Sequence, residues 1–212
     1  MTYQAFFFDF DGVLADSVEV KTRAFAKLYE PYGKEIVDKI VEHHRMNGGM
    51  TRREKFVFYH SKYLNMSLSG EFLEELCRKF SYLVFDEVIN SREIPGSVEF
   101  LKKWYKKVQC FVVSAAPEEE IVNITKCRSI NIYFREVLGS NRSKRENLEM
   151  ILEKYGLEPD KCIFFGDAES DYHAAKESGV NFMGILTGPE APLLKTAPKI
   201  KWAKNFIDVN IS

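Results

Sequence analysis

The chain has 212 residues, of which 45% are hydrophobic and 14% aromatic, enough to bury a core as one large domain or two small ones. Its 30 basic and 31 acidic residues give a formal net charge of -1, which argues against a nucleic-acid partner or an anionic membrane surface. The chain has four cysteines without a C-x-x-C pair, no signal-peptide profile at its start and no apolar run near the ~20 residues of a spanning helix, so we expect a reduced, cytoplasmic protein.

The first predicted element is a strand at residues 5–10, "AFFFDF". Three later runs resemble it: "VQCFVVSA" at 108–115, "CIFFGD" at 162–167 and "NFMGIL" at 181–186. Each run is apolar almost throughout, whereas a strand with one wet face alternates apolar and polar residues. We therefore expect four strands that are buried on both faces of a parallel sheet.

Residues 17–91 contain helical patterns and no convincing strand. A direct connection in an α/β unit usually takes about 2 to 6 residues, and this segment is far longer. We interpret it as a separate helical subdomain, a cap over the end of the sheet. Its predicted helices lie at 17–30, 34–44, 51–64 and 70–89.

From residue 92 onward, helical stretches alternate with the predicted strands, as in a doubly wound α/β sheet. Gly156 and Gly179 each end a stretch, and the Pro-containing segment 187–199 is predicted as a surface loop. The sequence thus predicts an α/β fold: a parallel-sheet core from residues 1–16 and 92–212 with an inserted α-helical cap at 17–91. The helical stretches of the core lie at 97–106, 117–127, 144–156 and 169–179.

Asp9 and Asp11 follow the first strand with one residue between them. Side chains two residues apart on an extended chain point the same way, so both carboxylates are expected at the carboxyl end of the strand, where α/β sheets bind ligands. Two carboxylates about 6.6 Å apart repel by roughly 2 to 3 kcal/mol at an effective dielectric near 20, so a cation is expected beside them. The alternative is one helix-capping and one solvated aspartate.

A second acidic cluster, "GDAESD", follows the strand at 162–167. It places Asp167 at the strand end and Asp171 at the start of a helix. Hard oxygen ligands of this kind suit Mg²⁺, which proteins usually hold with one or two carboxylates plus substrate phosphate. Taken alone, the cluster is also compatible with an acidic first turn favoured by the helix dipole.

Two further positions complete a candidate phosphate site. Ser114 ends the second strand, just before a helix that starts near Pro117, so its hydroxyl and nearby backbone N–H groups are placed to bind an oxyanion. Lys144 begins a helix in which Ser143 and Glu146 fit a capping box. The alternatives are an ordinary loop serine and a solvated lysine.

These motifs together resemble the haloacid dehalogenase superfamily, in particular its phosphoglycolate-phosphatase-like branch with a helical cap. The resemblance rests on "FFFDFDGVLADS", "VVSAA", Lys144 and "GDAESD", which occur in the family's order and rough spacing. It covers almost the whole chain. It implies a Mg²⁺-dependent phosphoric monoester hydrolase with a small phosphorylated metabolite as its substrate.

The resemblance also implies roles for individual residues. Asp9 would attack phosphorus to form an aspartyl-phosphate, and Asp11 would protonate the leaving oxygen and later deprotonate water. Mg²⁺ would be bound by the carboxylates of Asp9 and Asp167 and the backbone carbonyl of Asp11, with Asp171 acting through a metal-bound water or holding Lys144.

Ser114 and Lys144 would hold the phosphoryl oxygens of the substrate. Ala115 belongs to the same predicted substrate-binding set, although relatives often have Asn or Gly there, so a side-chain contact to phosphate is missing. Arg145 stands where many relatives have proline.

The cap stretch "NGGMTRREKF" at 47–56 is similar to the specificity loop of related phosphatases and mutases, and Gly49, Thr51 and Arg52 match it. Cations in the first turns of a helix oppose the helix dipole, so a nearby anionic ligand would account for Arg52, Arg53 and Lys55. We expect Arg52 to contact the substrate. The alternative is an exposed arginine beside a capping box of Thr51 and Glu54.

Two other functions use similar residues. A sugar-phosphate mutase would share the aspartates, but such mutases carry a cap histidine where this chain has Lys21. A receiver-like signalling domain has its acidic pair first and the phosphorylated aspartate later, and has no helical insertion. The sequence does not choose among phosphoglycolate, a sugar phosphate and a nucleotide as substrate, nor does it give the oligomeric state.

Overall fold

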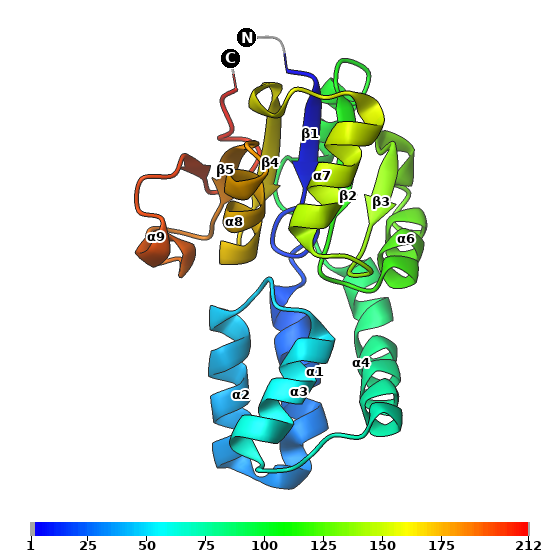
Figure 1. Ribbon diagram of the computed structural model, residues 1–212, viewed down its shortest axis with the longest axis vertical. Coiled ribbons are helices and arrows are strands. Elements are labelled where there is room, and N and C mark those ends of the chain that lie inside the picture. The colour runs from blue at the N-terminus through cyan, green and yellow to red at the C-terminus, as the bar shows by residue number, and fades with distance from the viewer. Residues whose placement is uncertain (1–2, 212) are drawn as a thin grey trace.

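The computed structural model describes residues 3–211, and its centre is a six-stranded parallel sheet with the strand order β3-β2-β1-β4-β5-β6 (Figure 1). The predicted α/β class is confirmed. The four predicted strands are present, and two short edge strands, β3 and β6, were not predicted. The strands are β1 (Ala5–Phe8), β2 (Gln109–Val113), β3 (Glu136–Leu138), β4 (Cys162–Gly166), β5 (Asn181–Ile185) and β6 (Trp202–Ala203).

The central strand β1 is buried on both faces because its side chains alternate between two hydrophobic clusters. Phe6 and Phe8 pack on one side with α5 (Ser97–Trp104) and α6 (Glu118–Cys127). Phe7 packs on the other side with helices α7 and α8. This double covering explains the continuous apolar runs and makes the sheet doubly wound. The second pair of helices spans α7 (Lys144–Tyr155) and α8 (Glu169–Glu177).

Four helices form a bundle beyond one end of the sheet, between β1 and α5 in the chain (Figure 1). At its centre the ring of Phe25 lies 4.4 Å from that of Phe80 and 5.4 Å from that of Phe56, measured between centroids. We call this bundle the cap; its exact boundaries at residues 17 and 91 stay a prediction. Its helices are α1 (Val18–Tyr29), α2 (Lys34–Met46), α3 (Arg52–Tyr63) and α4 (Gly70–Asn90).

The two connections between cap and core run side by side. The backbone N–H of Asp16 donates to the carbonyl of Arg92 at 2.8 Å. Arg128, just after α6, donates to the carbonyls of Val88, Ile89 and Ser91 at 2.8 to 2.9 Å. These carbonyls lie at the end of α4, where a helix runs out of N–H partners of its own, so the arginine ties the cap's last helix to the core.

Several residues predicted to begin or end helices do so in the structure. Capping boxes form at Thr51 with Glu54 and at Ser143 with Glu146, and Gly156 ends α7 with a positive φ of 61°. Within the segment predicted as a late loop lies a single-turn helix, α9 (Leu193–Thr196). Short 3-10 turns occur at Glu30–Tyr32, Asn131–Tyr133 and Pro159–Lys161. Across residues 3–211, every helix is too short or too polar to cross a membrane.

Candidate active site

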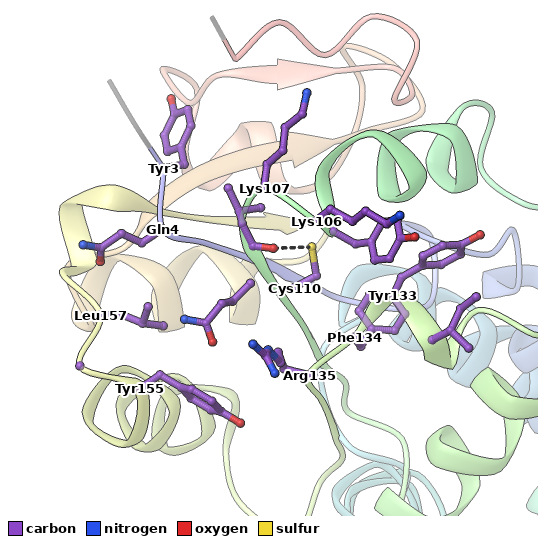
Figure 2. A pocket seen from close by; sticks show the side chains of 15 residues that line it. Tyr3, Gln4, Lys106, Lys107, Cys110, Tyr133, Phe134, Arg135, Tyr155 and Leu157 are labelled. Carbon is purple, nitrogen blue, oxygen red and sulfur yellow. Dashed lines mark hydrogen bonds between the residues drawn. The ribbon is translucent and has the colours of Figure 1, made fainter.

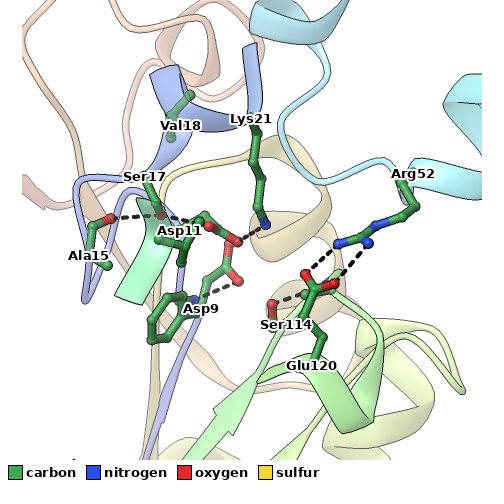
Figure 3. Close-up of polar contacts among 12 residues, drawn as sticks. Asp9, Asp11, Ala15, Ser17, Val18, Lys21, Arg52, Ser114 and Glu120 are labelled. Atoms are coloured by element: carbon green, nitrogen blue, oxygen red, sulfur yellow. Dashed lines mark hydrogen bonds and ion pairs between the residues drawn. The ribbon is translucent and has the colours of Figure 1, made fainter. Parts of the chain in front are cut away.

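The candidate site lies where three neighbouring strands end. Asp9 follows β1, Ser114 follows β2 and Asp167 follows β4, and β1 pairs with both of the other strands. The backbone N–H of Asp9 donates to the carbonyl of Phe165 at 2.9 Å, which continues the β1–β4 register past the strand end. Since the carboxyl ends of parallel strands share one edge, residues far apart in the sequence meet here. Figure 3 shows this edge facing the cap.

Three aspartates form an acidic cluster at this edge. Each of Asp9, Asp167 and Asp171 offers a carboxylate oxygen, and these oxygens all lie within 4.8 Å of one another. Burial raises the pKa of Asp9 to about 7, although Lys144 opposes the shift. Burial and then the charge of Asp9 raise the pKa of Asp167 well above its ordinary value. Lys144 supplies one positive charge beside Asp9, and a divalent cation would supply the further charge that ionised Asp9 and Asp167 need.

The chemistry of this donor set, three carboxylates, fits Mg²⁺. Asp171 has both oxygens engaged: Oδ1 accepts from Lys144 at 2.5 Å, and Oδ2 accepts from the backbone N–H groups of Asp167 at 3.1 Å and Ala168 at 3.0 Å. These bonds suit a residue that orients the loop and the lysine. Both oxygens of Asp9 also have partners, the backbone N–H of Phe10 at 2.7 Å and Nζ of Lys144 at 3.0 Å. The predicted direct binding of the ion by Asp9 and Asp167 stays a prediction.

Lys144 is the first residue of α7 and is buried between two of these carboxylates. Its Nζ lies 3.0 Å from Oδ2 of Asp9 and 2.5 Å from Oδ1 of Asp171. Burial alone would lower the pKa of Lys144, but Asp171 and Asp9 outweigh burial and raise it above the usual range. The ammonium is therefore a fixed positive charge beside Asp9.

Asp11 has a different environment from Asp9. Its Oδ2 forms an ion pair with Nζ of Lys21 on α1, and its Oδ1 accepts from the Ser17 hydroxyl at 2.6 Å (Figure 3). Burial favours the neutral acid, but Lys21 and Ser17 outweigh it and hold the pKa of Asp11 below its ordinary value. The pKa values of the two aspartates of one D-x-D motif are thus shifted in opposite directions: without a metal ion, Asp9 holds its proton more tightly than Asp11.

Two glycines allow the acidic loops to approach each other. Gly12 has a φ of +78°, and a Cβ at this position would lie 2.4 Å from Oδ2 of Asp167. A Cβ on Gly166 would lie 2.3 Å from Cβ of Asp171. Any larger side chain would push the carboxylates apart.

Ser114 is buried at the end of β2, and its Oγ accepts from the backbone N–H of Ala116 at 3.1 Å. Ala115 and Ala116 line the cavity above the aspartates. The predicted contact of Ser114, Ala115 and Lys144 with a phosphoryl group stays a prediction.

A small cavity of about 50 Å³ lies between cap and core. This is room for only about four water molecules, because one water needs about 10 to 15 Å³ of such space. Its floor carries Asp9, Asp11 and Asp167, and its cap side carries Lys21, Arg52 and Lys55 together with His44 and apolar side chains.

A wider hollow of about 760 Å³ lies elsewhere, lined among others by Tyr3, Lys107 and Arg135 (Figure 2). Among the described residues, none that lines this hollow is acidic. The volume of a cavity therefore does not identify the active site. The smaller cavity is the candidate because it is lined by Asp9, Asp11 and Asp167.

Arg52 lines the cavity, as expected for a substrate contact, but its guanidinium is already bound. It donates to Oε2 and Oε1 of Glu120 on α6 at 2.8 and 2.5 Å and to the hydroxyl of Ser81 at 2.6 Å. It also lies 4.7 Å from the ring centroid of Phe80. These contacts make Arg52 a bridge between cap and core, and its predicted role in substrate binding stays a prediction.

Two pairings of the site were not predicted from the sequence: that of Lys21 with Asp11 and that of Glu120 with Arg52. Lys21 follows Ser17 by four residues, about one helical turn, so the sequence could have placed the two side chains on the same face of the first cap helix. Glu120 is 68 residues from Arg52, and no local pattern links the two.

Comparison with known proteins places the chain in a family. The family model described as "Haloacid dehalogenase-like hydrolase" matches residues 6–185. The "Phosphorylated carbohydrates phosphatase" of Thermotoga maritima is 26% identical over 185 residues, which cover 84% of this chain and 82% of the relative. "Phosphoglycolate phosphatase 1" of Pseudomonas aeruginosa is 24% identical over 212 residues, which cover 91% of this chain and 74% of the relative.

A solved structure shares the fold. It is described as a predicted phosphoglycolate phosphatase from Haemophilus somnus and superposes with a TM-score of 0.76 at 19% identity, over 98% of this chain and 96% of the other. The expected enzyme class, a phosphoric monoester hydrolase, agrees with the names of the relatives. The resemblance inferred from the motifs is confirmed, and the chain belongs to the haloacid dehalogenase-like hydrolase family.

Proposed function

We propose that the protein is a Mg²⁺-dependent phosphatase of a small phosphorylated metabolite and that it acts through an aspartyl-phosphate. The observation that carries this proposal is the placement of Asp9: its carboxylate lies within 4.8 Å of a ligand oxygen of Asp167 and 3.0 Å from the Lys144 ammonium. A carboxylate in that position has two sources of positive charge for an incoming phosphate.

In the first step, a carboxylate oxygen of Asp9 forms a bond to phosphorus as the ester P–O bond breaks. Asp11, in its acid form, donates a proton to the leaving alkoxide. In the second step, Asp11 removes a proton from water, which attacks the aspartyl-phosphate and releases inorganic phosphate and the Asp9 carboxylate. Lys144 and Ser114 hold the phosphoryl oxygens in both steps.

The metal would be bound by the carboxylates of Asp9 and Asp167 and the backbone carbonyl of Asp11. When bound, Mg²⁺ supplies positive charge to the phosphoryl oxygens and lowers the repulsion met by the attacking carboxylate. Asp171 keeps Lys144 and the Asp167 loop in place through the contacts described above.

The names of the relatives support a phosphatase of small phosphorylated metabolites over a sugar-phosphate mutase or a signalling domain. Lys21 is also paired with Asp11 at the position where mutases of this type carry a histidine. A phosphatase releases one inorganic phosphate for each substrate consumed, whereas a mutase returns an isomeric phosphate ester.

The test is hydrolysis of a generic aryl phosphate by purified protein with Mg²⁺, followed by phosphate release. We expect turnover that EDTA abolishes and a loss of at least about a thousandfold in kcat for Asp9→Asn. Asp38→Asn changes an exposed aspartate on α2 and should retain wild-type turnover. Undiminished turnover in Asp9→Asn would remove Asp9 from the nucleophile role.

A further inference from the structure

Lys55 on α3 is a buried cation that the proposed reaction does not use. Its side chain lines the cavity that holds Asp9 and Asp11, and the residue is only 2% exposed. Nζ of Lys55 lies 2.8 Å from Nδ1 of His44 on α2 and 5.7 Å from the ring centroid of Phe25. An amine is thus fixed at the cap side of the cavity, opposite the aspartates.

The other cations on this wall are matched by carboxylates. Lys21 is paired with Asp11, and Arg52 is paired with Glu120. Within residues 3–211, Lys55 has no carboxylate at ion-pair distance. It is therefore the cation on this wall whose charge is left for a ligand to balance.

His44 does not supply negative charge. A protonated Lys55 can only donate, so beside it Nδ1 of His44 is the acceptor and the histidine ring is neutral. Burial, followed by the charge of Lys55, lowers the pKa of His44 to about 3, which keeps it neutral across the physiological range. The histidine orients the amine without balancing its charge.

Burying an ammonium without a counter-ion is costly. Burial, reinforced by the charge of Lys21, lowers the pKa of Lys55 to about 7, so the apo protein relieves that cost by partial deprotonation. An anion that enters the cavity would restore the charge and gain a charge-assisted hydrogen bond.

We propose that Lys55, oriented by His44, binds a second anionic group of the substrate, a carboxylate or a second phosphate, and so selects small phosphomonoesters that are charged at both ends. The proposal rests on the proposed function, because it takes the transferred phosphoryl group to lie at Asp9 and Lys144 on the core. Lys55 comes from the cap and faces the leaving group. The cavity of about 50 Å³ limits the spacer between the two charges to a few atoms.

The side chains between the two ends of the cavity agree with this arrangement. Val18, Phe25, Met50 and Phe80 line it and offer apolar surface to a short carbon spacer. A neutral group at the Lys55 end would leave the amine unpaired in the closed protein, which costs affinity even where the group fits by size.

The test compares three two-carbon substrates: phosphoglycolate, ethylene glycol bisphosphate and 2-hydroxyethyl phosphate. We expect wild-type kcat/KM to be at least about tenfold higher for one or both doubly charged compounds than for the hydroxyl compound, because only the former make a charge-assisted hydrogen bond with Lys55. The first two arms separate a carboxylate from a second phosphate. Lys55→Met should remove the preference, chiefly through KM.

Lys62→Met is the matched control, since Lys62 is exposed on the same helix; it should keep the wild-type preference. Binding is read separately by calorimetry in an Asp9→Asn background, where Lys55→Met should weaken phosphoglycolate or the bisphosphate at least about tenfold. That measurement needs no turnover, so it tests the anion site even if the proposed reaction fails.

Aryl phosphate hydrolysis without any preference for a doubly charged substrate would overturn the role of Lys55 and leave the phosphatase proposal standing. A preference for doubly charged substrates that persists in Lys55→Met would also overturn the role of Lys55. If Lys55→Met does not fold, the test rests on the wild-type protein alone: a kcat/KM for the doubly charged substrates no higher than that for 2-hydroxyethyl phosphate overturns the proposal. Absence of aryl phosphate hydrolysis contradicts the proposed function instead.

Discussion

The guanidinium of Arg52 and the carboxylate of Glu120 form a two-point ion pair, at 2.8 and 2.5 Å, that joins cap helix α3 to core helix α6. Both side chains are almost fully buried, at 5% and 7% exposure. A parallel pair of bonds fixes relative orientation as well as distance, so this contact helps to set how the cap closes over the aspartates.

Glu120→Gln should strongly destabilise the protein. The change leaves the Arg52 charge buried without a counter-ion, and removing one partner of a buried pair typically costs about 3 to 5 kcal/mol. The free energy of unfolding in urea measures it. Glu74→Gln is the control, because the Arg53–Glu74 pair also starts on α3 but is about half exposed; it should cost at most about 1 kcal/mol. Equal losses in the two variants would contradict a structural role for the buried pair.

The same pair allows the predicted substrate contact of Arg52 to be tested. If Arg52 only bridges cap and core, Arg52→Ala and Glu120→Gln should reduce kcat/KM for a panel of phosphorylated metabolites by similar factors. If Arg52 also touches the substrate, Arg52→Ala should change the ranking within the panel while Glu120→Gln preserves it.

Lys21→Met should move the pH profile for substrates with poor leaving groups. Lys21 holds the pKa of Asp11 down, and without it the effect of burial raises that pKa. Because the acid form of Asp11 is needed to protonate a poor leaving group, the alkaline limb of kcat/KM should shift to higher pH. Aryl phosphates, whose leaving groups need little protonation, should show no such shift. Lys27→Met changes an exposed lysine of the same helix and should leave both profiles in place.

Mg²⁺ should raise the melting temperature more at about pH 8 than at about pH 6. The raised pKa of Asp9, about 7 against 3.8, means that the metal-free folded protein holds a proton that the unfolded chain has lost between about pH 4 and pH 7. Its stability therefore falls as pH rises through that window, and protons compete with the metal below pH 7.

Asp167→Asn should raise the metal-free melting temperature at about pH 8 and abolish the Mg²⁺ shift. A shift that is independent of pH would contradict the assignment.

Gly12→Ala should destroy the metal response while costing little more stability than a comparable glycine elsewhere. Gly12 and Gly33 have similar positive φ values, +78° and +91°, so alanine costs about 1 kcal/mol of strain at either. Only at Gly12 would the new Cβ meet Asp167, since Gly33 has nothing within 4 Å. Activity with Mg²⁺ and the Mg²⁺-induced thermal shift should be lost in Gly12→Ala and kept in Gly33→Ala. Retention of both in Gly12→Ala would show that Asp167 can move without consequence.

Much of the fold could be read from local patterns. The apolar runs that became β1, β2, β4 and β5 were recognisable because burial on both faces leaves no alternation. The capping boxes of α3 and α7 were recognisable because they join residues three positions apart. Strands β3 and β6 were missed because they have three and two residues at the sheet edges, too few to carry a period.

By itself, the sequence determined the order of the elements, the insertion of the cap and the acidic motifs at strand ends, because each depends on neighbours in the chain. Only the tertiary structure decided the partners: Lys21 for Asp11, Glu120 for Arg52, and His44 for a Lys55 left without a carboxylate. Those pairings depend on how the cap sits on the core. That arrangement follows from packing between distant segments, and the pKa values of the site follow from the burial it creates.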